Sequence, residues 1–324
     1  MELSPKEYCI FIASHMKHNA RLQYLLECLK SLISQTVQIP IYLSISFDSN
    51  DVQSYCMDRL INEHDISNCG FLNICERGQP TSQMQHFNLL SKEYGELHKW
   101  IMFCDDDDTY QPNRTLHIAT IITNTQKQID ENNVGLSLAG LYESSSNKDH
   151  RQHRHEYWCY CVNIVLIKQF MEIVEEHPII LNDKCCDVLF GEYLRRKNNN
   201  WIFMKLPGHY YNYRVDDNSS SITGFIKSKQ SLYTNITTPP QMDSNNWQEY
   251  VFNWNEHLHD NIDIYLHDTY LRSLVGCNFE EILKSEFLAN YPLLSYVDKD
   301  HVIKINEKHI LVKAICDQLY DIKL

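Results

Sequence analysis

Short apolar runs alternate with amphipathic segments over the first 122 residues, and this alternation restricts the fold more than any other feature of the chain. The apolar runs cover residues 8–13, 40–47, 71–75 and 100–104. Segments 22–33, 52–63 and 82–94 lie between them and are expected to be helices, the first with its leucines at helical spacing. The alternation predicts an α/β fold with a mostly parallel central sheet, right-handed crossovers and flanking helices.

The fourth apolar run ends in four consecutive carboxylates, Asp105 to Asp108, and the segment closes at Pro112. The run lacks polar alternation, which favours a central strand covered on both faces. Four adjacent carboxylates repel one another unless they are solvated or surround a hard cation such as Mg²⁺ or Mn²⁺. A solvated turn at a helix start is the simple alternative. A buried strand leading directly into the acids favours a ligand site, because open α/β sheets bind ligands beyond the carboxyl ends of their strands.

Composition excludes several classes of function. The formal charge of -13 argues against nucleic acid as a partner, because phosphate backbones require a basic surface. The N-terminus has no signal-peptide pattern, and no apolar run approaches the length of a membrane span. The 12 cysteines include no CxxC pair, so we expect reduced core residues, no zinc site and a cytoplasmic location.

Beyond residue 122 the alternation loosens. Residues 135–141, 157–167 and 201–206 are expected to be strands, the second passing into a helix, and another helix is expected to begin near Asp187. The basic segment 150–155 is expected to be a solvated loop, with a lid over a ligand as the alternative. A polar stretch containing Pro239 and Pro240 suggests a linker, so we predict domains 1–224 and 225–324.

The C-terminal region is expected to be helical. One apolar stripe runs from Trp247 to Tyr265 and is expected to belong to a helix ending at Gly276. Asn278 and Glu281 match a capping box, and a last helix is expected over 306–321. No chemical constellation stands out here, so we expect an accessory or oligomerisation role, with the stripe forming core or a homo-oligomer face.

The order of these features resembles the family 2 glycosyltransferases of GT-A fold, over roughly residues 8 to 222. The resemblance is carried by Arg21 before Ser31-Leu-Ile-Ser-Gln-Thr36, a strand ending at Asp48, a helix with Asn88, and a strand followed by Asp-x-Asp-Asp-x-x-x-Pro. It implies a Rossmann-like GT-A domain. It also implies transfer of a sugar, with inversion, from a nucleotide-sugar donor to a hydroxyl of a glycan, glycolipid or protein acceptor, and the donor expected from the family is a UDP-sugar.

The resemblance also implies roles for single residues. Asp105 and Asp107 form the DxD motif, in which Asp107 holds Mn²⁺ or Mg²⁺ and Asp105 lies near the donor ribose. A segment that matches Tyr-Arg-x-His in the family has Asp216 in place of the histidine, so the third metal ligand is Asp216 or His209. The implied donor-binding residues are Ser14, Arg21, Asp48, Asn88, Asp105 and Asp106.

Asp187 matches the family's general base, which takes the proton of the attacking hydroxyl. The family usually has glutamate before this aspartate, and this chain has Cys186. An ordinary helix N-cap is the alternative reading of Asp187, and Asp183 is the neighbouring candidate for the base. Two other functions stay open: a retaining transferase of the same fold, and a catalytically degenerate carbohydrate- or metal-binding module.

Overall fold

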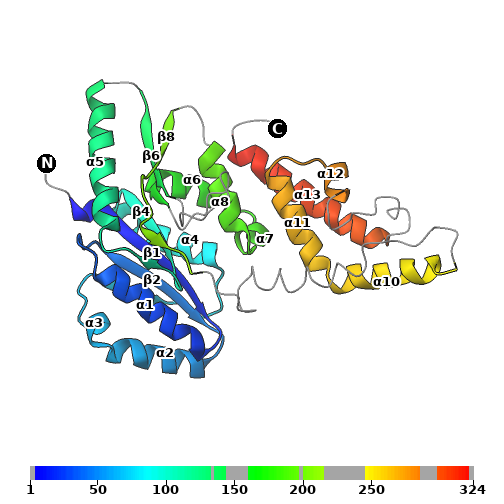
Figure 1. Cartoon of the computed structure of the whole chain (residues 1–324), viewed down its shortest axis with the longest axis horizontal. Helices are drawn as coiled ribbons and strands as arrows, with labels where there is room; N and C mark the ends of the chain where they lie inside the picture. The colour runs from blue at the N-terminus through cyan, green and yellow to red at the C-terminus, as the bar shows by residue number, and fades with distance from the viewer. Residues whose placement is uncertain are drawn as a thin grey trace. The chain divides into compact units, whose positions relative to one another are not determined.

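The computed structural model describes residues 4–132, 135–143, 160–196, 200–214, 245–284 and 298–320. The chain divides into two compact units (Figure 1). The first comprises Met1–Arg214 with Leu319–Asp321, and the second comprises Val215–Gln318 with Ile322–Leu324. The predicted domain boundary at residue 224 and the role of the C-terminal region stay predictions.

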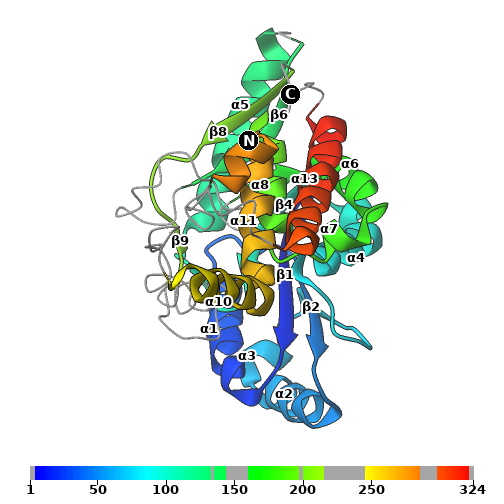
Figure 2. The same ribbon diagram turned by 90° about the vertical axis from the view of Figure 1, so that its right-hand side faces the viewer.

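A seven-stranded sheet forms the centre of the first unit. Its strands are β1 (Tyr8–Met16), β2 (Ile41–Phe47), β3 (Leu72–Glu76), β4 (Trp100–Asp105), β6 (Ser137–Tyr142), β7 (Cys161–Asn163) and β8 (Trp201–Lys205). They are ordered β3-β2-β1-β4-β7-β6-β8, and β1 and β2 lie side by side in Figure 2. Only β7 runs against its neighbours among the described strands of this sheet. The predicted α/β class with a mostly parallel central sheet is confirmed.

Helices cover both faces of the sheet. They are α1 (Leu22–Ile33), α2 (Asn50–Asn62), α3 (His64–Ser67), α4 (Gln83–Tyr94), α5 (Arg114–Asn132), α6 (Ile164–Glu175), α7 (Pro178–Leu181) and α8 (Cys186–Arg196). On β4 the ring of Phe103 contacts Phe87 of α4, whereas Cys104 contacts Cys28 of α1. Successive strand residues point to opposite faces, so α1 and α4 pack on opposite sides of β4.

The segments after β4 and β8 pair in a short second sheet. Strand β5 (Thr109–Tyr110) is antiparallel to β9 (Tyr211–Asn212). Beside it, Arg114 forms a fully buried ion pair with Glu143, and its guanidinium lies 4.0 Å from the ring centre of Tyr110. Glu143 also accepts a hydrogen bond from the backbone N–H of Tyr210. The pair therefore joins α5 to the end of β6 and to the segment leading into β9.

We expect Glu143→Gln to destabilise the protein by about 3–5 kcal/mol, because it leaves the buried Arg114 charge without its counter-ion. The free energy of unfolding in urea measures this loss. Glu131→Gln is the matched control, since Glu131 forms an exposed pair with Lys127 and should cost under about 1 kcal/mol. Equal losses in the two variants would contradict the importance of the buried pair.

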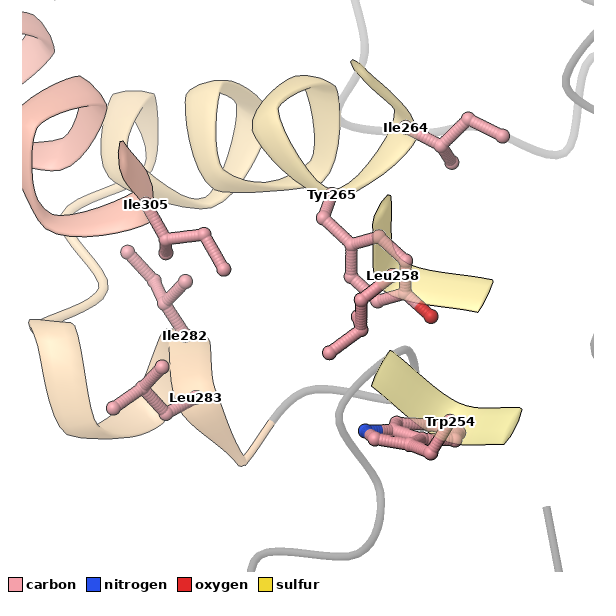
Figure 3. Packing of buried hydrophobic residues seen from close by; sticks show 7 residues of the cluster. All are labelled: Trp254, Leu258, Ile264, Tyr265, Ile282, Leu283 and Ile305. Atoms are coloured by element: carbon pink, nitrogen blue, oxygen red, sulfur yellow. The ribbon is translucent and has the colours of Figure 1, made fainter. Parts of the chain in front are cut away.

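The second unit is helical among its described residues, with α10 (Trp247–Asp260), α11 (Ile262–Leu274), α12 (Phe279–Leu283) and α13 (Lys299–Leu319). The single helix predicted from Trp247 onward is wrong, because the chain turns at Asn261, whose side chain donates to His257 O at 2.8 Å. The turn lets both halves of the stripe face one core (Figure 3), formed by Trp254, Leu258, Ile264, Tyr265, Ile282, Leu283 and Ile305.

The predicted helix end at Gly276 and the predicted helix start at Asn278 are confirmed. Gly276 follows α11 with φ of 91°, which glycine adopts without strain. Asn278 and Glu281 form the reciprocal capping box. Among the described helices of the whole chain, none has the length and apolar character needed to cross a membrane.

Candidate active site

The four acids form a tight turn at the carboxyl end of β4. The backbone N–H of Asp108 donates to Asp105 O at 3.2 Å and closes the turn. Oxygen atoms of Asp105, Asp107 and Asp108 all lie within 4.8 Å of one another. The turn therefore gathers three carboxylates around one point at the centre of the sheet edge.

Asp106 is held by the predicted donor-binding residues on the N-terminal side. Its Oδ2 accepts from Ser14 Oγ at 2.7 Å, and its Oδ1 accepts from Arg21 at 2.8 Å. The same Arg21 nitrogen lies 3.2 Å from Asp107 Oδ2. Asp106 raises the pKa of Arg21, so the guanidinium remains charged. Ser14 and Arg21 therefore contact the acidic turn directly, and the positive charge of Arg21 offsets part of the negative charge of the aspartates.

Two residues that the sequence did not single out hold the other acids. Gln83, the first residue of α4, donates to Asp105 Oδ1 at 2.8 Å. Tyr211 OH accepts the backbone N–H of Asp105 at 3.0 Å and donates to Asp108 Oδ2 at 2.8 Å. One phenol therefore fixes both ends of the turn.

Arg214 closes the turn from the C-terminal side. Its backbone N–H donates to Asp108 Oδ1 at 2.7 Å, and its Nε donates to Asp107 O at 2.9 Å. Its guanidinium pairs with Glu27 and lies over the ring of Tyr24, both on α1. Residues from both ends of the first unit consequently converge on four consecutive aspartates.

The electrostatics of the turn favour a cation. Burial, followed by the charge of Asp106, raises the pKa of Asp107. Burial raises the pKa of Asp108 to about 8, against hydrogen bonds that favour its charged form. A divalent cation would relieve both effects, and hard cations prefer carboxylate oxygens. The donor set therefore fits Mn²⁺ or Mg²⁺, with Asp105 and Asp107 as the partly exposed ligands and Asp108 buried.

The Ser31-to-Thr36 motif clamps the chain that follows the acids. Ser31 Oγ accepts the N–H of Tyr110 at 3.1 Å, and Gln35 donates to Gln111 O at 2.9 Å. Thr36 N–H donates to Pro112 O at 2.9 Å. The motif at the end of α1 therefore fixes the loop between the acidic turn and α5.

Asp48 lies at the same edge, directly after β2. Its Oδ1 is 2.8 Å from His15 Nε2, at the end of β1, and its side chain is 46% exposed. The parallel register places His15 opposite Ser46, so the carboxyl ends of β1 and β2 meet here. The expected position of Asp48 beside the donor base or ribose stays a prediction.

Three other predicted donor-binding or metal-binding residues, Asn88, His209 and Asp216, have no described contact with the acidic turn. Asn88 is buried in the second turn of α4, and neither atom of its side-chain amide has a hydrogen-bond partner among the described residues. His209 precedes β9, and continuing the β5–β9 register places it opposite Pro112, four residues beyond Asp108. Neither is brought to the acidic turn by these contacts. Asp216 and the basic segment 150–155 lie outside the described residues.

Asp187 is the second residue of α8, so the N-cap position belongs to Cys185 and not to the aspartate. Asp183 accepts the N–H of Cys185 at 3.0 Å in the turn before the helix. Asn182 accepts from Ser82 Oγ at 2.8 Å, next to the Gln83 that binds Asp105. The start of α4 thus joins the segment preceding α8 to the acidic turn.

His86 on α4 is a buried neutral histidine, and burial lowers its pKa to about 3. Because the unfolded-state pKa is about 6.5, we expect His86 to reduce stability as pH falls from 6.5 toward 3, by up to about 1.4 kcal/mol per pH unit. Above pH about 6.5 the histidine is neutral in both the folded and the unfolded state, so the protein loses no stability through His86. Urea unfolding of His86→Gln across this range should show a shallower pH dependence than the parent chain. His64→Gln, at an exposed histidine, should follow the parent, and an unchanged slope for His86→Gln would contradict the assignment.

Comparisons with known proteins add likenesses of fold. No family model matches the chain, and no protein of curated function matches it. TarS 1-349 from S. aureus, in complex with UDP, is 13% identical, with 96% of this chain and 91% of that chain covered and a TM-score of 0.43. The mannosyltransferase PcManGT from Pyrobaculum calidifontis, in complex with GDP-Man and Mn²⁺, is 12% identical, with 93% and 86% covered and a TM-score of 0.44. Similarity at this level does not establish a shared activity.

Proposed function

We propose that this chain is a metal-dependent glycosyltransferase of GT-A fold that moves a sugar from a nucleotide-sugar donor to an acceptor hydroxyl. The observation that carries the proposal is the braced acidic turn Asp105–Asp108 at the carboxyl end of the central strand β4. A departing nucleoside diphosphate gains negative charge, and a bound divalent cation offsets that charge without proton transfer. The order of motifs along the sequence supports the same class. Membership of family 2 stays a resemblance.

In this proposal Asp107 and Asp105 hold the cation, with Asp216 as the third ligand implied by the resemblance. Asp108 is a further ligand suggested by its distance to the other two acids. Arg21 stabilises the turn through Asp106 and Asp107, and in the proposal it also contacts the donor diphosphate. Asp48, at the end of β2, receives the nucleoside, and we propose a UDP-sugar as donor.

Asp187 is the proposed general base of an inverting displacement. An aspartate is ionised at neutral pH with a reference pKa of about 3.9, so it can accept the proton of the acceptor hydroxyl. The link between Ser82 and Asn182 supports a position of α8 near the donor. A retaining transferase would not need this base.

The proposal is tested by incubating the full chain with UDP-sugars and GDP-mannose, with Mn²⁺ or with EDTA, and measuring release of nucleoside diphosphate. Release that depends on Mn²⁺ is expected. NMR of the product gives its anomeric configuration, and retention would replace the inverting mechanism with the retaining alternative.

The degenerate binding module is the second candidate, because Cys186 and Asp216 stand where the family has glutamate and histidine. A thermal-shift screen with Mn²⁺ reports binding without turnover, since a ligand that binds the folded state raises its melting temperature. A stabilising nucleotide sugar that is never consumed would support the module and overturn the enzyme.

A further inference from the structure

A continuous line of hydrogen-bonded side chains runs through the first unit and ends at Asp48. We name it the Arg77–Asp48 chain, and its members in order are Arg77, Ser44, His86, Ser46, His15 and Asp48. The successive donor–acceptor distances are 2.7, 2.8, 3.1, 2.9 and 2.8 Å. It connects the segment after β3 to β2, α4 and β1.

The direction of the first hydrogen bonds follows from Arg77. Its guanidinium is held by two hydrogen bonds to Glu93, at 2.7 and 2.9 Å, and its Nε–H can only donate to Ser44. Ser44 is fully buried. A buried hydroxyl proton needs an acceptor, and His86 Nδ1 lies 2.8 Å away. Ser44 therefore donates to His86 Nδ1.

The same reasoning carries the direction through His86 and Ser46. Burial lowers the pKa of His86 to about 3, so the ring is neutral and its one proton lies on Nε2. That proton is donated to Ser46 Oγ, which also accepts the backbone N–H of Thr81 at 3.2 Å. With both lone pairs of Ser46 used, its own proton goes to His15 Nδ1.

The last step fixes His15 and Asp48. A neutral His15 that accepts at Nδ1 carries its proton on Nε2, where Asp48 Oδ1 lies 2.8 Å away. A carboxylate only accepts. Every hydrogen bond therefore points from the arginine to the aspartate, with no buried donor or acceptor of the chain left over, and reversal of any one link would break its neighbours.

We infer that His15 is a positioning residue for Asp48, held in its Nε2–H form by the Arg77–Asp48 chain. The inference rests on the proposed function where it assigns Asp48 to the donor nucleoside. The carboxylate is 46% exposed with Oδ1 bound to His15, so it meets a ligand in one orientation and accepts from N–H or O–H groups. The chain also ties this end of β2 to α4, whose Gln83 holds Asp105.

Nitrogen-15 NMR of histidine-labelled full-length protein tests the hydrogen-bond directions of the Arg77–Asp48 chain without any ligand. At about pH 8, above the reference histidine pKa of about 6.5, we expect His15 and His86 to be Nε2–H tautomers. His98 is an internal control with the opposite form, because its Nδ1 lies 2.8 Å from the carbonyl of Lys6, which can only accept. Loss of signals in His15→Phe assigns the resonances. An Nδ1–H form of His15 would overturn the inference.

Donor kinetics test the positioning role. We expect His15→Phe and Ser46→Ala each to raise the donor KM about tenfold or more with kcat within about threefold, as for a lost hydrogen bond to a charged group. The double variant should be no worse than His15→Phe, because both changes break the same link. Ser54→Ala, at an exposed serine of α2, is the control. Additive effects or unchanged KM values would overturn the role, whereas absence of transfer in the parent chain would count against the proposed function and leave the tautomer result intact.

Discussion

Asp107→Asn should remove nearly all metal-dependent transfer. We expect kcat/KM for the donor to fall by about 10³-fold or more, since the cation's stabilisation of the leaving group is worth several kcal/mol and each 1.4 kcal/mol is tenfold in rate. The Asp107 side chain is partly exposed and accepts a hydrogen bond from Arg21, so the amide also weakens that pairing. Nucleoside diphosphate release at saturating Mn²⁺ measures the loss.

Metal binding separates this effect from misfolding. Mn²⁺ affinity, measured by calorimetry, should fall in Asp107→Asn while the melting temperature without metal stays equal or rises, because one of four adjacent like charges is removed. Asp58→Asn, on the exposed surface of α2, is the matched control. Undiminished Mn²⁺ affinity in Asp107→Asn would show that the cation is bound elsewhere.

Asp187→Asn should lower kcat by about 10²–10⁴-fold, the usual contribution of a positioned general base. Donor binding should be retained, because the acidic turn and Arg21 are unchanged. Single-turnover transfer to an acceptor, compared with thermal shift by the donor, separates the two effects. Asp187 occupies the first turn of α8, where a negative side chain is favoured, so a small loss of stability accompanies the change.

The parallel variant Asp183→Asn distinguishes the two candidate bases. Asp183 accepts the N–H of Cys185, and its amide keeps an oxygen for that bond. We expect transfer to persist in Asp183→Asn. Loss of transfer in Asp183→Asn with full activity in Asp187→Asn would move the base to Asp183, and full activity in both variants would favour the retaining alternative.

Local periodicity predicted most of the first unit. Apolar runs and helically spaced leucines can be read from neighbouring residues alone, so β1, β2, β4 and α1 lie where these patterns predict them. The antiparallel direction of β7 could not be derived, because strand direction depends on the connections around it. The break at Asn261 was missed since the stripe continues across it and both halves face one core.

The candidate site was predictable only in part. Asp105 to Asp108 and Arg21 are visible because acids follow an apolar run and an arginine precedes a recognisable motif. Gln83, Tyr211 and His15 carry no such local signal, since their roles come from partners far away in sequence. Ser44 and Ser46 offer one usable sign: two hydroxyls on the same face of a fully buried strand must have polar partners above them.

The bonds that Tyr211 and Arg214 make to the acidic turn have a consequence for the order in which the protein folds. They join residues separated by 103 to 107 positions in the chain. Contacts of such high sequence separation form only after large loops have closed, which slows their formation relative to local structure. A nascent chain that has emerged only as far as β8 holds β4 and its four acids but lacks the phenol and the arginine that shape them. The fully braced turn therefore forms only after residues 211–214 have been synthesised, and the proposed Mn²⁺ binding is expected only from that point on.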